Sequence, residues 1–184
     1  MDHESTILEQ ISQTKQKFYQ DNTKSRIFKN TQKLQCAKQV SEQHNLQQLI
    51  NLTVMVIPNT NKLYFNYLMF KTYGHPDICC KLYDHFHKLV EDLVNKYGSF
   101  EMHINLSTFT VSACVRYQKM IMLSFDENPY LTSKMTLMNV YNTPNVIEQI
   151  TGLLYNSVKH LTSVTHFYKK DNSESLIKKL FEHV

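Results

Sequence analysis

Residues 76–106 read PDICCKLYDHFHKLVEDLVNKYGSFEMHINL, and this stretch carries the clearest structural signal in the chain. Its first part has apolar residues at steps of three and four, a spacing that places them on one face of a helix. That face consists of Ile78, Leu82, Phe86, Leu89, Val90, Leu93, Val94 and Tyr97. Gly98 ends the helix, because glycine readily adopts the left-handed conformation of a helix cap. Apolar and polar residues then alternate over 100–106, which predicts a strand.

The alternation of helix and strand continues toward the C-terminus. Periodicity and turn residues predict helices at 110–126, 144–159 and 173–183, and short strands at 136–142 and 164–168. Such an order is typical of a mainly parallel sheet covered by helices. The fold class predicted for this part of the chain is therefore α/β.

The first third of the chain has a different pattern. Two segments rich in β-branched and aromatic residues, 53–57 and 62–71, lie on either side of turn-forming residues at 58–61. This order predicts a hairpin. Residues 1–50 are rich in Gln, Lys and Asn, and their apolar spacing predicts two helices. We therefore expect an N-terminal helical arm, 1–50, and an α/β domain, 51–184. The arm either packs on the domain or binds a protein partner.

The composition excludes several classes of protein. The 184 residues carry a net charge of +4, but basic and acidic residues are mixed and form no basic stripe, so we expect no nucleic-acid partner. The three glycines, Gly74, Gly98 and Gly152, do not have the spacing of a phosphate-binding loop, and no cofactor is predicted. The four cysteines include no C-x-x-C pair and are expected to be free thiols.

The N-terminus and the hydropathy indicate where the protein works. Residues 1–20 are polar and lack the apolar segment of a secretory signal. No run approaches the roughly 18 apolar residues that cross a bilayer. We therefore expect a cytoplasmic protein with at most transient membrane contact.

Two groups of polar residues are candidates for chemistry. Glu101, His103 and Asn105 share one strand face and could transfer protons, but no nucleophile motif accompanies them. Four residues suited to zinc lack the regular spacing of a structural site, namely His75, Asp77, Cys79 and Cys80. We therefore predict no catalytic centre and no metal site.

Two segments carry a family resemblance. Residues 105–112 read NLSTFTVS and residues 129–144 read PYLTSKMTLMNVYNTP. They resemble the CRAL-TRIO pattern, in which a strand ends in Asp-x-x-Gly, a helix and a Tyr-Pro-Glu-Arg-like loop follow, and a second strand ends in Asn-Ala-Pro. The most specific part is Asn142-Thr143-Pro144. The resemblance covers roughly residues 60–184 and implies a CRAL-TRIO-like fold within the STAS-like superfold.

The STAS domain, which has a related fold and a similar element order, is the alternative family. Ser112 would then lie near the phosphorylated serine of STAS domains, although Val111 replaces the acid before it. The sequence departs from the CRAL-TRIO pattern, because Asn105 replaces the Asp and Thr108 the Gly of Asp-x-x-Gly. A second interpretation therefore stays open, in which the protein is an interaction scaffold of this fold that has lost its ligand.

The CRAL-TRIO resemblance implies a non-catalytic binding module that holds a lipid or other hydrophobic ligand between the sheet and a gating helix. The helix at 145–158 would be the gate, and the aromatic strand at 63–70 would form another wall. Thr162 matches a threonine near the headgroup in phosphoinositide transfer proteins of this family. The ligand-binding residues expected on this basis are Val146, Ile147, Ile150, Leu153, Leu154, Phe65, Tyr67 and Thr162.

Overall fold

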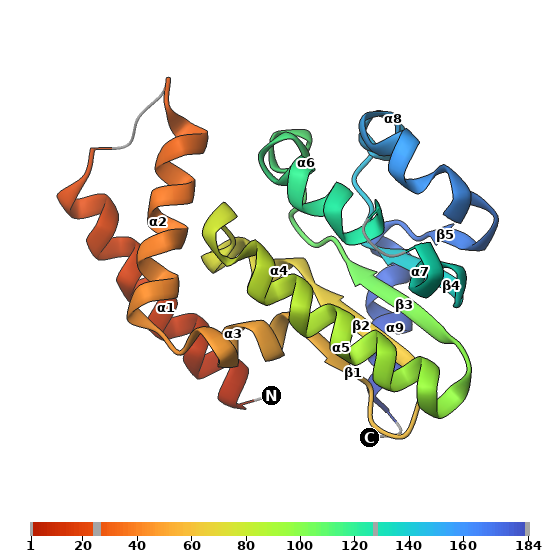
Figure 1. Cartoon of the computed structure of the whole chain (residues 1–184). Helices are drawn as coiled ribbons and strands as arrows, with labels where there is room; N and C mark the ends of the chain where they lie inside the picture. Colours follow the sequence, from red (N-terminus) through yellow and green to blue (C-terminus); the bar gives the residue numbers. More distant parts are fainter. Residues whose placement is uncertain (1, 24–26, 127–128, 183–184) are drawn as a thin grey trace.

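A five-stranded sheet forms the centre of the computed structural model, which describes residues 2–23, 27–126 and 129–182 (Figure 1). The strands lie in the order β1-β2-β3-β4-β5. Their bounds are Val54–Val56, Lys62–Asn66, Phe100–Asn105, Met135–Tyr141 and Thr165–Phe167. The first two are antiparallel and form the predicted hairpin, and the other pairs are parallel. The predicted α/β class with a mainly parallel sheet is confirmed.

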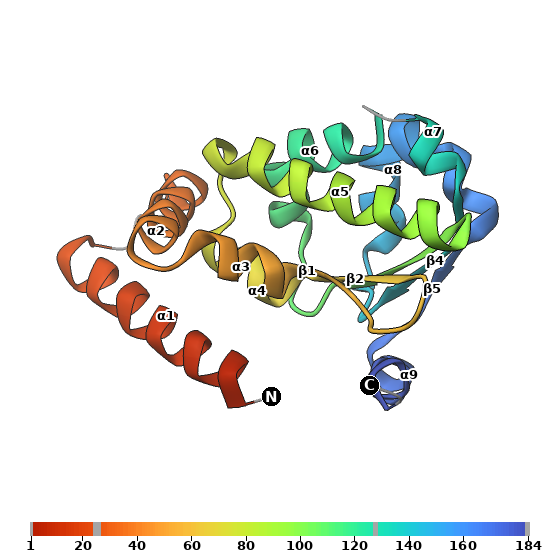
Figure 2. The same ribbon diagram turned by 60° about the horizontal axis from the view of Figure 1, so that its bottom comes forward.

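Helices cover the sheet unequally. Figure 2 shows α5, α6, α7 and α8 over one face and α9 over the other. Short 3-10 segments, η1 and η2, precede α5 and follow α8. The bounds are η1 Pro76–Ile78, α5 Cys79–Tyr97, α6 Val111–Asp126, α7 Pro129–Ser133, α8 Ile147–Val158, η2 Lys159–Val164 and α9 Lys170–Phe181.

The helix and strand predicted in residues 76–106 form as expected. Gly98 has φ +78°, and its N–H donates to the carbonyl of Val94 at 2.8 Å, which closes α5. The apolar side chains of β3 then pack against this helix, with Phe100 and Leu93 in one buried cluster. Local cap chemistry and the alternating strand pattern therefore agree with the tertiary packing.

Alanine substitution at two glycines is expected to change stability in opposite directions. Neither added Cβ would have a neighbour within 4 Å, so backbone conformation decides the result. Gly98→Ala places a side chain in the left-handed region and should cost about 1 kcal/mol. Gly152→Ala lies inside α8 and should stabilise the protein by about 0.5–1 kcal/mol. Urea unfolding measures both, and changes of the same sign would contradict this interpretation.

The strand predicted at 62–71 is wrong after Asn66, because α4 spans Tyr67–Tyr73. The Asn66 side chain accepts a hydrogen bond from the Met69 N–H at 3.4 Å and so caps the helix. Burial of Met69, Phe70 and Tyr73 in the core stabilises the helix. Aromatic residues suit both a strand and a buried helix, so the composition misled the prediction.

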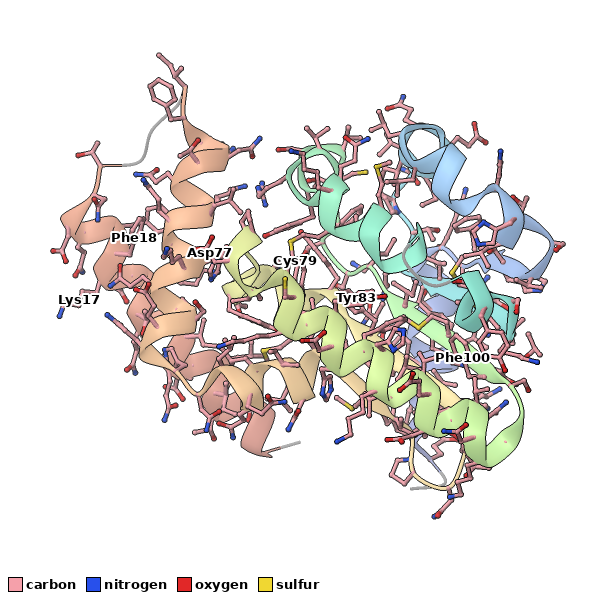
Figure 3. The ribbon with its side chains drawn as sticks, viewed as in Figure 1. Lys17, Phe18, Asp77, Cys79, Tyr83 and Phe100 are labelled. Carbon is pink, nitrogen blue, oxygen red and sulfur yellow. The ribbon has the colours of Figure 1, made fainter. Side chains whose placement is uncertain are left out.

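In the described residues before the sheet there are three helices, not the expected two: α1 Asp2–Asp21, α2 Lys29–Gln43 and α3 Leu46–Thr53. The expected boundary at residue 50 therefore falls inside α3. Ile11 and Val40 share a buried cluster with Phe70 of α4. Figure 3 shows Phe18 between α1 and α2, with Lys17 on the outer side of α1. The N-terminal helices thus pack against α4 through a common core.

Candidate functional site

The register of the parallel strands builds an apolar floor on the face under α5, α6 and α8. Phe65, Ile104, Val140 and Phe167 align as neighbours across β2, β3, β4 and β5. The adjacent row has Met102 and Met138 at its centre and ends at Thr165. Since strand side chains alternate between faces, these two rows project to the same side of the sheet.

Helices wall a pocket of about 440 Å³ above this floor. Figure 3 labels Cys79 and Tyr83, which lie in the first turns of α5 and line the pocket. The lining residues from the three covering helices are Cys79, Leu82, Tyr83 and Phe86 of α5, Tyr117, Met120 and Ile121 of α6, and Ile147, Ile150, Thr151 and Leu154 of α8. The space between the layers is therefore only partly filled by side chains.

The pocket is electrically neutral. Its lining, among the described residues, contains no Asp, Glu, Lys, Arg or His side chain. Burial raises the pKa of Tyr67 and of Tyr117 above the ordinary value for tyrosine, so both phenols stay protonated. The polar groups that remain in the lining are hydroxyls and one thiol. Two of the hydroxyls belong to Thr162, just before β5, and to Thr165 in β5, the strand at the edge of the sheet. Such a surface suits an uncharged, apolar guest.

Six of the eight expected ligand-binding residues line this pocket, namely Phe65, Tyr67, Ile147, Ile150, Leu154 and Thr162. Val146 lies before α8 begins and packs against the buried cluster that contains Ile150 and Leu154. Leu153 is 43% exposed and points away from the pocket. These two residues lie outside the pocket lining because α8 starts at Ile147 and turns only part of its apolar surface inward.

The sequence pattern does not identify most of the pocket floor or the wall formed by α6. The pattern predicts Ile104 and Val140 only as strand residues, because nothing in the local sequence distinguishes the floor of a pocket from a filled core. For Tyr117 and Ile121, the helical spacing in 110–126 was the available signal. It indicates an inward face, but the gap between that face and the sheet depends on packing between distant segments.

The opposite face of the sheet holds the polar group considered for catalysis. His103 is buried, with its Nδ1 2.9 Å from the Tyr141 hydroxyl and its Nε2 3.3 Å from a carboxylate oxygen of Glu101. Asn105 donates to the Tyr64 hydroxyl at 3.0 Å. His103 thus bonds to Tyr141 and Glu101, whereas Asn105 bonds to another tyrosine, and none of these side chains lines the apolar pocket.

The residues considered for zinc do not assemble into a site. Within the described part of the chain, no group of three or more His, Cys, Asp or Glu side chains could hold a metal ion. Asp77 instead forms an ion pair with Lys38 at 2.6 Å and lies 3.8 Å from His75. The four cysteines are free thiols, as expected.

Acid is expected to destabilise the fold through two histidines. Burial lowers the pKa of His103, although the Glu101 carboxylate acts to raise it, and burial likewise lowers the pKa of His75 against the influence of Asp77. Both imidazoles therefore take up protons more readily in the unfolded chain. Their contribution to stability is complete above the unfolded pKa of about 6.5 and is lost as the pH falls below it.

Urea unfolding at about pH 8 and about pH 5 measures this effect. The His103→Gln variant, which keeps a hydrogen-bonding group beside Tyr141, should depend less on pH over this interval. A pH dependence as steep as that of the unmodified protein would exclude a role for His103.

Comparisons with protein-family models, with curated protein sequences and with solved structures found no match. None of the helices in the described residues has both the length and the apolar character needed to cross a membrane. The fold and the pocket together define an α/β domain with an internal apolar pocket.

Proposed function

We propose that this protein is a non-catalytic binding module for a lipid or other hydrophobic ligand. The observation that carries the proposal is the neutral, apolar pocket of about 440 Å³ between the sheet and α5, α6 and α8. Ligand pockets commonly measure about 300–1,000 Å³ and combine apolar walls with a few polar groups. A scaffold with a filled interior, the alternative left open by the sequence, would need no such space.

The volume of the pocket favours a ligand with a single aliphatic chain. An apolar protein cavity of about 150 Å³ accepts benzene. The present pocket is about three times as large, which corresponds to roughly 18 carbon atoms by the same measure. A single long aliphatic chain therefore fits, whereas a second chain of the same length would need further space.

The arrangement around α8 supports a CRAL-TRIO-like architecture as part of this proposal. Four parallel strands follow one another in sequence order, with α5, α6, α7 and α8 of the connecting segments on one face (Figure 2). The helix that the resemblance identifies as the gate, α8, supplies Ile147, Ile150 and Leu154 to the pocket. An outward movement of α8 would open the pocket without disturbing the strands.

Uptake of a fatty acid from vesicles tests the proposal. Delipidated protein is incubated with phosphatidylcholine vesicles that contain palmitic acid or monopalmitoylglycerol, then separated and weighed by native mass spectrometry. We expect one palmitoyl chain per protein and an increase in the thermal midpoint, because a ligand that binds only the folded state stabilises it. Unchanged mass and midpoint with both lipids would refute the proposal.

A further inference from the structure

The start of α2 exposes two adjacent apolar side chains, which we call the α2 tip. Ile27 is 87% exposed and Phe28 is 68% exposed, so they are the two most exposed large apolar residues in the described part of the chain. The start of α2 lies at the outer edge of the molecule, away from the strands (Figure 1). Single exposed apolar residues are common on protein surfaces, but an adjacent pair at a projecting end indicates a contact surface.

The stability of α2 does not account for the residues at its start. Phe28 occupies the N-cap position, where Ser, Thr, Asp or Asn would accept a hydrogen bond from the first helical turn and a phenyl ring cannot. The first turn also contains no acidic residue and begins with Lys29, although negative charge is what stabilises this end of a helix. An apolar and cationic helix start therefore serves α2 poorly, and a contact outside the chain explains it better.

Positive charge surrounds the α2 tip. The sequence of residues 22–41 contains no Asp or Glu. Lys29 and Lys33 are both exposed and lie one helical turn apart on α2. Arg116 of α6 adds a third cation, because its guanidinium donates to the side-chain oxygen of Asn30 at 2.9 and 3.3 Å. The apolar pair therefore has cations on its own helix and on a neighbouring one.

The size and charge of the α2 tip favour a lipid surface over a protein partner. A stable interface between proteins buries about 800 Å² on each side and involves some 20–30 residues per partner. Two projecting side chains offer much less than that. A bilayer accepts so narrow a projection, because apolar side chains enter the acyl region while neighbouring cations stay among the headgroups. Anionic lipids attract Lys and Arg near the membrane surface, so the charge of the tip matches theirs.

We propose that Ile27 and Phe28 insert into the surface of an anionic membrane while Lys29, Lys33 and Arg116 face the lipid headgroups. The contact is peripheral and reversible, because two side chains bury less apolar surface than a single acyl chain, which itself anchors a protein only reversibly. None of these five residues lines the apolar pocket, so the inference does not depend on the uptake of a lipid.

Cosedimentation of the full chain with phosphatidylcholine vesicles, with and without phosphatidylserine, tests the proposal. We expect binding to the vesicles that contain phosphatidylserine, and this binding should weaken with added salt because salt screens the attraction. The Ile27→Ser/Phe28→Ser variant should bind at least about tenfold more weakly, since it removes the inserted apolar surface. The Lys29→Gln/Lys33→Gln variant should also bind at least about tenfold more weakly, since it removes two charges near the headgroups.

Stability separates the loss of membrane contact from the loss of structure. Serine is a preferred N-cap residue, so the Ile27→Ser/Phe28→Ser variant should keep or raise the thermal midpoint of unfolding. The matched control is Tyr130→Ser/Leu153→Ser, which removes side chains that are 63% and 43% exposed on α7 and α8. The control should bind vesicles like the unmodified protein. Equal vesicle binding by the tip variant and the control would overturn the proposal.

Fluorescence of the Phe28→Trp variant locates the contact directly, because the sequence contains no other tryptophan. On binding to phosphatidylserine vesicles, its emission should shift to shorter wavelength, and lipids with brominated acyl chains should quench it. Unchanged emission on bound vesicles would place the membrane contact elsewhere and refute the proposal. Absence of sedimentation at about 1 mM lipid would do the same. So would a dimer that requires Ile27 and Phe28 and forms in place of vesicle binding, since it would identify a contact between proteins.

Discussion

Replacing Ile104 with tryptophan is expected to reduce palmitic acid uptake at least about tenfold without destabilising the fold. Ile104 lies on the central strand β3 with helices above it, yet its side chain is only half-buried. The exposed part of the Ile104 side chain faces the pocket, which this residue lines. An indole at this position therefore extends into the space that the lipid chain would occupy.

The expected stability of this variant follows from the same geometry. A larger side chain in a filled core forces shifts that commonly cost about 1–3 kcal/mol. In a pocket of about 440 Å³ the added ring has room and gains contacts with the walls. The unfolding midpoint should therefore stay constant or rise while uptake falls. Uptake equal to that of the unmodified protein would place the ligand elsewhere.

Val115→Trp is the matched control for an added indole. Val115 lies on α6 but is 55% exposed and does not line the pocket. Its substitution should leave palmitic acid uptake unchanged. Reduced uptake in both variants would indicate a general effect of the added aromatic surface and would contradict the assignment of the pocket.

The parts of the fold that could be predicted are those in which local chemistry and packing agree. The α5–β3 segment combines a continuous apolar face, the cap at Gly98 and an alternating strand, and each forms as expected. The segment after Asn66 is different, since Tyr67–Tyr73 has the composition of a strand but the cap and burial of a helix. There the core formed with α2 and α3 outweighs β propensity.

The pocket itself depends on distances that a sequence pattern does not contain. Ile150 and Leu153 are equally apolar neighbours on one helix, yet one lines the pocket and the other is exposed. Which side of α8 faces inward is set by its packing, above all against α6, which is remote in sequence.

The Phe100→Ala variant is expected to lose about 3–5 kcal/mol of unfolding free energy, the usual loss for a buried phenylalanine. Phe100 is 1% exposed at the start of β3 (Figure 3) and packs in a cluster with Val90, Leu93 and Met135. The cavity left by the ring cannot collapse easily, because β2 and β4 hold β3 on both sides. Urea unfolding measures the loss.

Phe181→Ala makes the same chemical change at a residue that is 37% exposed on α9. Its ring packs edge-to-face against Tyr64, with centroids 5.2 Å apart, but is partly open to solvent, so the loss should be about 1 kcal/mol. A loss as large as that for Phe100→Ala would mean that α9 is as important to the core as β3.

The lipid affinity of Phe100→Ala separates stability from binding. Phe100 does not line the pocket, although Met102, two residues along the same strand, does. The folded fraction of the variant should therefore take up palmitic acid with unchanged affinity. This affinity is measured without urea, at a temperature at which most of the protein is folded. Ile104→Trp should show the reverse, with stability retained and uptake lost. If both variants lost affinity in proportion to stability, the pocket would be a packing defect and not a binding site.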